Sequence, residues 1–568
     1  MPSASTRRRS RALLALTALV AALLAGPGAA QAQTQTPPAT PKADCGPGSR
    51  PETGLQGRVS PEDHASGRAA QGFTCNTEMV GQYRVPNTIG TVGGFKVERY
   101  VDAAGHDCAY YDTTLLYPTN LLDQEGGVNA VDMSDPKHPK VTARLITGAM
   151  NTPHESLVVS QKRGLLAAVA GNPLTQAGVI DIYDISKDCR QPELKSSTPM
   201  GLLGHESGIS PDGNTFYSAS PAGQTLVAVD ISNPTLPIPI SFFRIDSHGL
   251  SISNDGRRAY VAGTGSGLHI LDTSQVQERA PNAQMTEISN LTWPTMSIPQ
   301  NAIPVTIDGR KYAMEIDEFG TLSKVGAARV IDIQDEKNPK VVGDMRLEVH
   351  DPKNFDAIRG DNGADNPLQG YAGHYCNVPS RVDPGIVACS FILSGLRVFD
   401  VRDPTRPREI AYFNAPVDPR ILPAAGIVPS PSNWAMSSPS FVPERGEIWY
   451  SDGLSGFYAV RVTNGRWPFR DSGGAGDCLR SATLGFKLHR IEGTRVVRVE
   501  ATVNGKRRLR QTGRDIRRVT LRNMKRAGRL TVRIVATHNT GSKVVSTRTW
   551  NGCKKGKPSV RRIPRPRR

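Results

Sequence analysis

The sequence predicts an all-β protein in which a seven-bladed β-propeller is followed by a small immunoglobulin-like β-sandwich. Three observations lead to this fold class: a short apolar strand ending in Asp recurs along the chain, a hairpin turn precedes each copy, and apolar residues alternate with polar ones near the C-terminus. The 568 residues include 55 Gly, 43 Pro and 38% apolar residues. This composition suits a turn-rich folded protein and excludes a disordered chain, a collagen and a polytopic membrane protein.

Residues 1–32 have the features of a signal peptide. Four arginines precede an apolar run from Ala12 to Ala25, and Ala30-Gln31-Ala32 suits cleavage before Gln33. The run is too short to span a bilayer comfortably, and no second apolar run of that length follows. We therefore expect a secreted or cell-envelope protein with no transmembrane segment after cleavage, and we expect residues 33–74 to be a flexible leader.

The body of the chain repeats one unit. Successive Asp-ended strands finish 52, 46, 42, 60, 68 and 61 residues apart, which is the size of a four-stranded sheet with insertions. Turns such as Pro211-Asp212-Gly213 and Asn254-Asp255-Gly256 predict a hairpin before each copy. Four-stranded sheets repeated radially make a propeller. The repeated strands are Val128–Asp132, Val179–Asp184, Leu226–Asp230, Leu268–Asp272, Ala328–Asp332, Leu396–Asp400 and a degenerate copy at Phe457–Arg461.

The seventh unit lacks an outer strand of its own. Near the N-terminus, however, Asn76–Tyr83 resembles the outer strands Lys340–Met345 and Arg408–Phe413. We expect this N-terminal strand to complete the last blade. The propeller then spans residues 75–467, and a linker follows at 468–477.

The repeats resemble those of a known family. Leu226 to Pro234 and Leu396 to Pro404 are similar to the LVIVD repeat of secreted bacterial β-propeller proteins. This resemblance implies a propeller fold and leaves the activity open, because the family is defined by its repeats. A more distant likeness in architecture, without a matched motif, is to the selenium-binding protein group, which includes copper-dependent methanethiol oxidases.

Four histidines occupy similar places in four of the units, at or near the start of the inner strand. Because inner strands line the channel of a propeller, these side chains and two adjacent carboxylates are expected to face one another at the channel mouth. In the fifth and seventh units a Trp stands near the corresponding position. The predicted channel-mouth residues are His154, Glu155, His205, Glu206, His248, His374, Trp293 and Trp434.

Two interpretations of these histidines stay open. They can bind a ligand or hold the blades together by hydrogen bonds to loop carbonyls. Alternatively, His154, His205, His248 and His374 ligate copper, iron or zinc, since imidazole nitrogen binds all three, and the protein is a metal-dependent oxidoreductase. The sequence identifies no catalytic residue and favours the binding interpretation.

Eight cysteines in an exported chain indicate disulfides. Cys376 and Cys389 flank a predicted hairpin turn, and Cys478 and Cys553 bracket the C-terminal segment. The pairing of the remaining four, Cys45, Cys75, Cys108 and Cys189, cannot be deduced from their spacing.

The charge is concentrated at the C-terminus. Residues 471–568 carry 27 basic and 5 acidic residues, whereas residues 33–470 have a net charge of −9. Alternating apolar positions predict a basic β-sandwich at 478–553, and residues 554–568 have too few apolar residues to pack and should be a disordered tail. The near absence of aromatic residues argues against sequence-specific nucleic-acid binding.

These observations favour an exported propeller that binds an unknown protein or small molecule at its channel mouth. The basic domain would hold it against anionic polymers of the cell envelope.

Overall fold

A computed structural model describes residues 36–85, 92–113, 126–171, 178–200, 204–319, 325–366, 370–419, 431–468, 483–488, 494–524, 530–541 and 543–550. The predicted signal peptide, Cys478, Cys553, the basic tail and all but the first residue of the linker lie outside these ranges. Among the described residues, helices are too short or too polar to cross a membrane.

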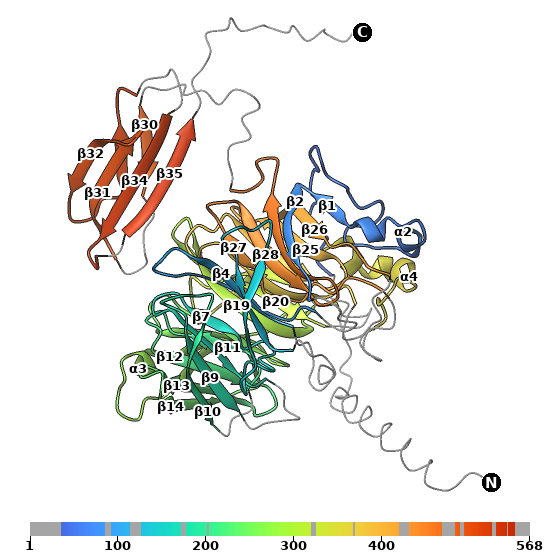
Figure 1. The fold of residues 1–568 in the computed structure, drawn as a ribbon, viewed down its shortest axis with the longest axis horizontal. Coiled ribbons are helices and arrows are strands. Elements are labelled where there is room, and N and C mark those ends of the chain that lie inside the picture. Colours follow the sequence, from blue (N-terminus) through green and yellow to red (C-terminus); the bar gives the residue numbers. More distant parts are fainter. Residues whose placement is uncertain are drawn as a thin grey trace, which may run out of the picture. The chain divides into compact units, whose positions relative to one another are not determined.

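Between residues 73 and 462 the described strands form seven antiparallel sheets, and in each sheet consecutive strands of the chain lie side by side (Figure 1). Five sheets have four consecutive strands each. Their strands are β3 (Val97–Val101), β4 (Asp107–Asp112), β5 (Val128–Asp132) and β6 (Lys140–Leu145); β7 (Val158–Ser160), β8 (Leu165–Val169), β9 (Val179–Asp184) and β10 (Glu193–Pro199); β11 (Ser207–Ile209), β12 (Thr215–Ser220), β13 (Thr225–Asp230) and β14 (Ile238–Arg244); β15 (Ser247–Ile252), β16 (Arg258–Gly263), β17 (Gly267–Asp272) and β18 (Thr286–Leu291); and β19 (Ile298–Ile307), β20 (Arg310–Glu318), β21 (Ala328–Asp332) and β22 (Lys340–Met345).

The last two sheets each include a strand from the N-terminal part of the chain. One contains β23 (Gly373–Asn377), β24 (Ile386–Phe391), β25 (Gly395–Asp400) and β26 (Arg408–Asn414), with β1 (Phe73–Cys75) added beside β26. The other contains β27 (Ser440–Val442), β28 (Glu447–Asp452) and β29 (Gly456–Val462), and β2 (Thr77–Tyr83) pairs with β29 at its edge. β2 is the strand that the sequence analysis assigned to this edge.

The Asp at the end of each third strand has a local structural role. In six sheets its Oδ1 accepts a hydrogen bond from the backbone N–H two residues later, at 2.8 to 3.0 Å, as for Asp132 and Ser134. A carboxylate that satisfies the first amide after the strand forms an Asx-type turn and so ends the strand. The recurring Asp is therefore explained without a catalytic role.

The apolar core lies mainly between neighbouring sheets. Val330 of β21 and Val387 of β24, for example, belong to one buried cluster that joins two sheets. Because both faces of such a sheet are covered, the middle strands are apolar on both faces, as in the fully buried β8.

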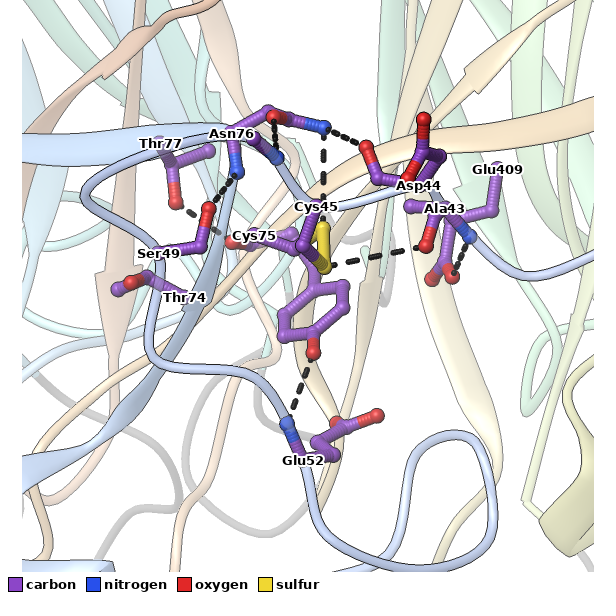
Figure 2. The surroundings of a disulfide bond; sticks show 12 residues. Ala43, Asp44, Cys45, Ser49, Glu52, Thr74, Cys75, Asn76, Thr77 and Glu409 are labelled. Atoms are coloured by element: carbon purple, nitrogen blue, oxygen red, sulfur yellow. Dashed lines mark hydrogen bonds between the residues drawn. A yellow bond between two sulfur atoms is a disulfide. The ribbon is translucent and has the colours of Figure 1, made fainter.

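The segment before β1 differs from the flexible leader expected. From Thr40 onward it is attached to the sheets, and it contains α2 (Pro61–Ala65) and the 3-10 turn η1 (Ala69–Gln71). Cys45 and Cys75 form a disulfide, and the Asn76 side chain donates to the backbone oxygens of Asp44 and Ile410 (Figure 2). Composition alone suggested a flexible leader, but these long-range contacts hold the segment against the sheets.

A buried ion-pair cluster holds the same segment. The Arg397 guanidinium, which is fully buried, pairs with Glu52 of the N-terminal segment and with Glu409 of β26. Glu409 also accepts hydrogen bonds from the Ala43 backbone and the Gln56 side chain. One arginine is thus shared by two carboxyl groups that would otherwise be buried without a counter-charge.

Two further disulfides are present. Cys376 and Cys389 are opposite each other on β23 and β24, as the hairpin predicted. Cys108 of β4 forms a disulfide with Cys189, which lies in the loop between β9 and β10. Disulfides of this kind fit an extracellular protein.

The described residues between the sheets also include two short α-helices and two 3-10 turns. They are α3 (Ser274–Gln277) and α4 (Phe355–Ile358), and η3 (Glu348–His350) and η4 (Pro352–Asn354).

The C-terminal segment forms two sheets around its own core. The larger sheet has the order β32 (Lys506–Thr512), β31 (Val496–Val503), β34 (Leu530–His538) and β35 (Lys543–Trp550). The smaller pairs β30 (Leu484–Lys487) with β33 (Arg518–Leu521). Both sheets contribute buried apolar residues to one cluster, including Val499 and Val519.

Replacing Arg397 with Leu should destabilise the protein by about 3 to 5 kcal/mol, because Glu52 and Glu409 would remain buried without a counter-charge. Urea unfolding of the full chain, with disulfides intact, measures this change. Arg406→Leu is the matched control, since Arg406 is 85% exposed and pairs with Asp403, so its loss should change stability by less than about 1 kcal/mol. Equal effects of the two substitutions would contradict the buried-pair role of Arg397.

Candidate functional site

Four histidines from four different sheets lie together. His154 and His205 come just before β7 and β11, and His248 and His374 are the second residues of β15 and β23. Their rings pack in series, with centroid separations of 4.5 Å between His154 and His205 and 4.6 Å between His205 and His248. The structure therefore brings together all four histidines that the sequence selected.

Glu155 lies at the centre of this cluster. Its Oε2 is 3.2 Å from His205 Nε2 and 3.9 Å from His248 Nε2. Its Oε1 is 3.3 Å from His374 Nε2 and 3.9 Å from His154 Nε2. One carboxylate thus faces an imidazole nitrogen from each of the four sheets.

A second carboxylate, Glu318, was not predicted from the sequence. Its oxygens are 2.9 Å from His374 Nε2 and 3.3 Å from His248 Nε2. Glu318 is the last residue of β20, a second strand, whereas the sequence search considered the starts of first strands. No sequence signal distinguished it, because Glu315 and Asp317 are carboxylates of the same strand.

β-Bulges orient three of the side chains at the site. The register of the first two strands shifts between Ser247 and Gly249, between Pro299 and Asn301, and between Gly373 and Tyr375. The extra residue in each case is His248, Gln300 or His374. Because a bulge changes the direction of one side chain without ending the strand, the same irregularity in three sheets sends three polar groups to one place.

Backbone carbonyls fix two of the imidazole rings. His248 Nδ1 is 2.9 Å from the Pro299 oxygen, and His374 Nδ1 is 2.6 Å from the Met436 oxygen. A carbonyl can only accept, so Nδ1 carries the proton and donates it in both residues. Nε2 of each ring is left to face the two carboxylates.

A group of polar side chains lies next to the cluster. Gln300 Nε2 donates to Glu155 Oε2 at 2.7 Å. Lys96 Nζ is 2.8 Å from Glu206 Oε1, which also accepts from Asn301, and Lys96 lies over the ring of Tyr375. Glu206 is therefore paired with a buried lysine and does not face the imidazoles as Glu155 does.

Gly249 leaves space for Glu206. A Cβ at this position would lie 1.5 Å from Glu206 Oε2 and 2.1 Å from the Gln300 carbonyl oxygen. Residue 249 must therefore be glycine for the Glu206 side chain to occupy its observed position.

Burial and neighbouring charges raise the pKa of two of the four histidines and lower the pKa of the other two. Burial acts to lower the pKa of His374, but the close carboxylates of Glu155 and Glu318 outweigh it and raise the pKa to about 10. The same competition raises the pKa of His205. For His154, burial and the charge on His205 lower the pKa to about 3, and burial also lowers the pKa of His248.

The pKa values of two carboxyl groups also shift, in opposite directions. Burial alone would raise the pKa of Glu155, but the surrounding imidazoles, His205 first, hold it well below its usual range. Burial raises the pKa of Glu206 to about 7 despite the nearby Lys96. The close carboxylates thus favour the protonated forms of His374 and His205, and the imidazoles favour the ionised form of Glu155.

The cluster is open to solvent on one side. The side chains of His154 and His205 are 15% and 19% exposed, whereas Glu155 and Glu318 are 2% and 3% exposed. His374 is fully buried. His154 and His205 are therefore the members of the cluster nearest to solvent.

The two predicted tryptophans have different surroundings. Trp434 belongs to a buried apolar cluster with Phe95 and Tyr375, and the Phe95 ring packs on His154 at 4.4 Å. Trp293 instead lies over the Arg329 guanidinium and donates from its indole to Asp317. Arg329 and Asp317, with Glu315, form a buried ion-pair group, and Trp293 is part of it.

A second group of histidine and carboxylate side chains has a structural explanation. His106, Asp102 and Asp188 lie close enough to share an ion. However, Asp102 accepts from the backbone of Ala104 and Cys189, and Asp188 forms a two-point pair with Arg190. These contacts organise the β3–β4 turn beside the Cys108–Cys189 disulfide.

Comparison with known proteins gives one family match. The LVIVD repeat matches residues 212–242, which include β12, β13 and most of β14. No curated protein matches the chain.

Solved structures with a similar fold share little sequence with the chain. The β-propeller domain of Cps50 (Swd1) from Myceliophteria thermophila has a TM-score of 0.43 and 11% identity, over 68% of this chain and 99% of that one. The periplasmic gluconolactonase PpgL of Pseudomonas aeruginosa has a TM-score of 0.41 and 15% identity, over 60% and 93%. A putative 6-phosphogluconolactonase from Bacteroides fragilis has a TM-score of 0.39 and 11% identity, over 67% and 92%.

The repeated four-stranded sheets and the family match agree with the resemblance found in the sequence: the chain carries an LVIVD repeat, and its fold is consistent with an LVIVD-repeat β-propeller.

Proposed function

We propose that the protein is an extracytoplasmic, seven-bladed β-propeller that binds a ligand at the cluster of His154, His205, His248, His374, Glu155 and Glu318. A propeller with LVIVD repeats suggests a binding or scaffold protein. The observation that carries the proposal is the convergence of Glu155 with imidazoles from four separate sheets. Such a group of buried, charged side chains is costly to assemble unless it binds something.

Contacts between the first strands support seven blades in a closed ring. Glu155 and Glu206 bridge the starts of two adjacent units, and His248 contacts the Pro299 oxygen of the next. At the junction of the first and last sheets, the Val97 backbone N–H donates to the Ser438 oxygen and the Ser440 hydroxyl donates to the Val97 oxygen. These contacts join three pairs of neighbouring units near their first strands, including the first and last units.

The chemistry of the cluster indicates a cationic ligand. Glu155 and Glu318 are buried carboxyl groups, and in the absence of another cation the protons of the neighbouring imidazoles offset the charge on Glu155. A cation that enters past His154 and His205 would replace those protons.

The basic C-terminal domain supports retention at the cell envelope. On β32 the side chains of Lys506, Arg507, Arg508 and Arg510 are exposed, and like charges gathered on one strand attract polyanions. We take this domain to be an immunoglobulin-like β-sandwich.

A metal-dependent oxidoreductase is a second candidate function. The tautomers of His248 and His374 favour it, because both rings direct Nε2 toward the carboxylates. In that case copper, iron or zinc bound at the cluster would supply the redox or Lewis-acid chemistry, and the histidines and glutamates would hold the ion.

Access to the cluster can be measured by imidazole acylation with diethylpyrocarbonate, followed by peptide mass spectrometry. His138, which is 82% exposed, should react fastest, His154 more slowly, and His248 and His374 least, since their side chains are 4% and 0% exposed. If His374 reacts as fast as His154 in the folded protein, the site is not closed on its buried side and the proposed route of entry is wrong.

Retention can be tested on a column of immobilised polyphosphate with a salt gradient. Arg507→Glu combined with Arg508→Glu should make the full chain elute at lower salt, because fewer phosphate contacts release fewer counterions. Arg402→Glu combined with Arg406→Glu, which changes the same charge on an exposed propeller turn, should have a smaller effect. An equal shift in both variants would show that net charge alone determines retention.

A further inference from the structure

We propose that the cluster is a mononuclear metal site in which Glu155, Glu318, His248 and His374 ligate a divalent first-row transition ion, with His154 and His205 on the solvent side. The inference rests on the proposed function, because it names the cation that the cluster binds. It also differs from the four-histidine ligand set that was the alternative interpretation of the sequence.

The donor atoms are close enough for one ion. An oxygen from each of Glu155 and Glu318 and a nitrogen of His374 all lie within 4.8 Å of one another, and all three residues are buried. His248 Nε2 approaches the same carboxylates at 3.3 Å and 3.9 Å. Each of these four side chains is at most 4% exposed.

Some of these atoms have no hydrogen bond that would account for their burial. Among the described residues, His374 Nε2 and Glu318 Oε2 are buried and make no hydrogen bond of good geometry, although they are 2.9 Å apart. Buried polar atoms are nearly always satisfied. Donor atoms that face a common point without bonding one another are what an ion between them requires.

Neighbouring groups hold the ligands in the orientation that a metal needs. Metal-binding histidines commonly donate their other ring N–H to a carbonyl, as His248 and His374 do through Nδ1. Gln300 donates a hydrogen bond to Glu155 Oε2. Metal-ligating carboxylates are commonly positioned by such hydrogen bonds from residues that do not contact the metal. The β-bulges that contain His248, Gln300 and His374 make this arrangement part of the backbone.

The donor types select the class of ion. Two imidazole nitrogens disfavour Mg²⁺ and Ca²⁺, which prefer oxygen ligands throughout. Imidazole with carboxylate suits Zn²⁺, Fe²⁺, Co²⁺ and Cu²⁺. His154 and His205 approach Glu155 from the exposed side, where they can contact a further ligand on the ion.

The test uses the full chain, exported with its disulfides intact, stripped with a chelator and reloaded with Zn²⁺ or Co²⁺. Metal content after desalting should be one equivalent, Zn²⁺ should raise the melting temperature, and excess Mg²⁺ should not displace it. Co²⁺ absorption bands report on the coordination. Glu318→Gln and His374→Gln should weaken Zn²⁺ binding by about a hundredfold or more, beyond the range seen for outer-shell partners.

Two control variants separate this site from others. His138→Gln should keep Zn²⁺ affinity within about threefold, because the His138 side chain is 82% exposed and lies outside the cluster. His106→Gln disrupts the unrelated group with Asp102 and Asp188. Melting of the metal-free variants shows whether each still folds. If Glu318→Gln or His374→Gln does not fold, the Co²⁺ spectrum of Glu155→Gln tests the ligand set in its place.

The proposal is wrong if the wild-type chain binds no Zn²⁺ or Co²⁺, if folded Glu318→Gln and His374→Gln bind as tightly as wild type, or if His106→Gln alone removes the metal. A metal-free protein in which His154 is acylated while His374 is protected would overturn the metal site and leave the binding function standing. Failure of both measurements would overturn both proposals.

Discussion

The position of Glu155 depends on a single constraint: a buried carboxylate must be paired with positive charge or strong hydrogen-bond donors. Glu155 is 2% exposed, and its partners come from separate sheets of the chain: His205, His248, His374 and Gln300. No single sheet can supply them. The charge on Glu155 is therefore compatible with folding only when the first strands of these units are correctly assembled.

The units share two local features, one at the outer end of the third strand and one at the start of the first strand. The Asp that ends the third strand makes the same turn in six sheets, and that turn requires only local geometry. At the start of the first strand, four sheets place a His at the cluster and a fifth places Gln300 there. The bulge is present in three sheets, with His248, Gln300 and His374 as the extra residues, so the backbone irregularity repeats while one of the three side chains differs.

The N-terminal segment contributes more to the fold than its composition suggests. It supplies strands to two sheets, a disulfide and one member of the Arg397 ion-pair group. Its many Gly and Pro residues favour irregular structure, yet irregular structure can be well ordered when its polar groups find partners in the sheets, as Asn76 and Glu52 do. Amino-acid composition does not show which residues these polar groups contact in the fold.

The sequence by itself determined the repeated features. Asp-ended strands, hairpin turns and the facing pair Cys376 and Cys389 depend on residues close together in the chain, and for that reason they were predictable. The recurrence of His at the start of the inner strand also identified four residues of the cluster. Tertiary structure alone decided the rest. Glu318 joins the site from a second strand, Trp293 belongs to a separate ion-pair group, and Cys45 and Cys108 pair with Cys75 and Cys189. Each of these depends on which side chains meet across sheets, and local periodicity does not specify contacts between residues far apart in the chain.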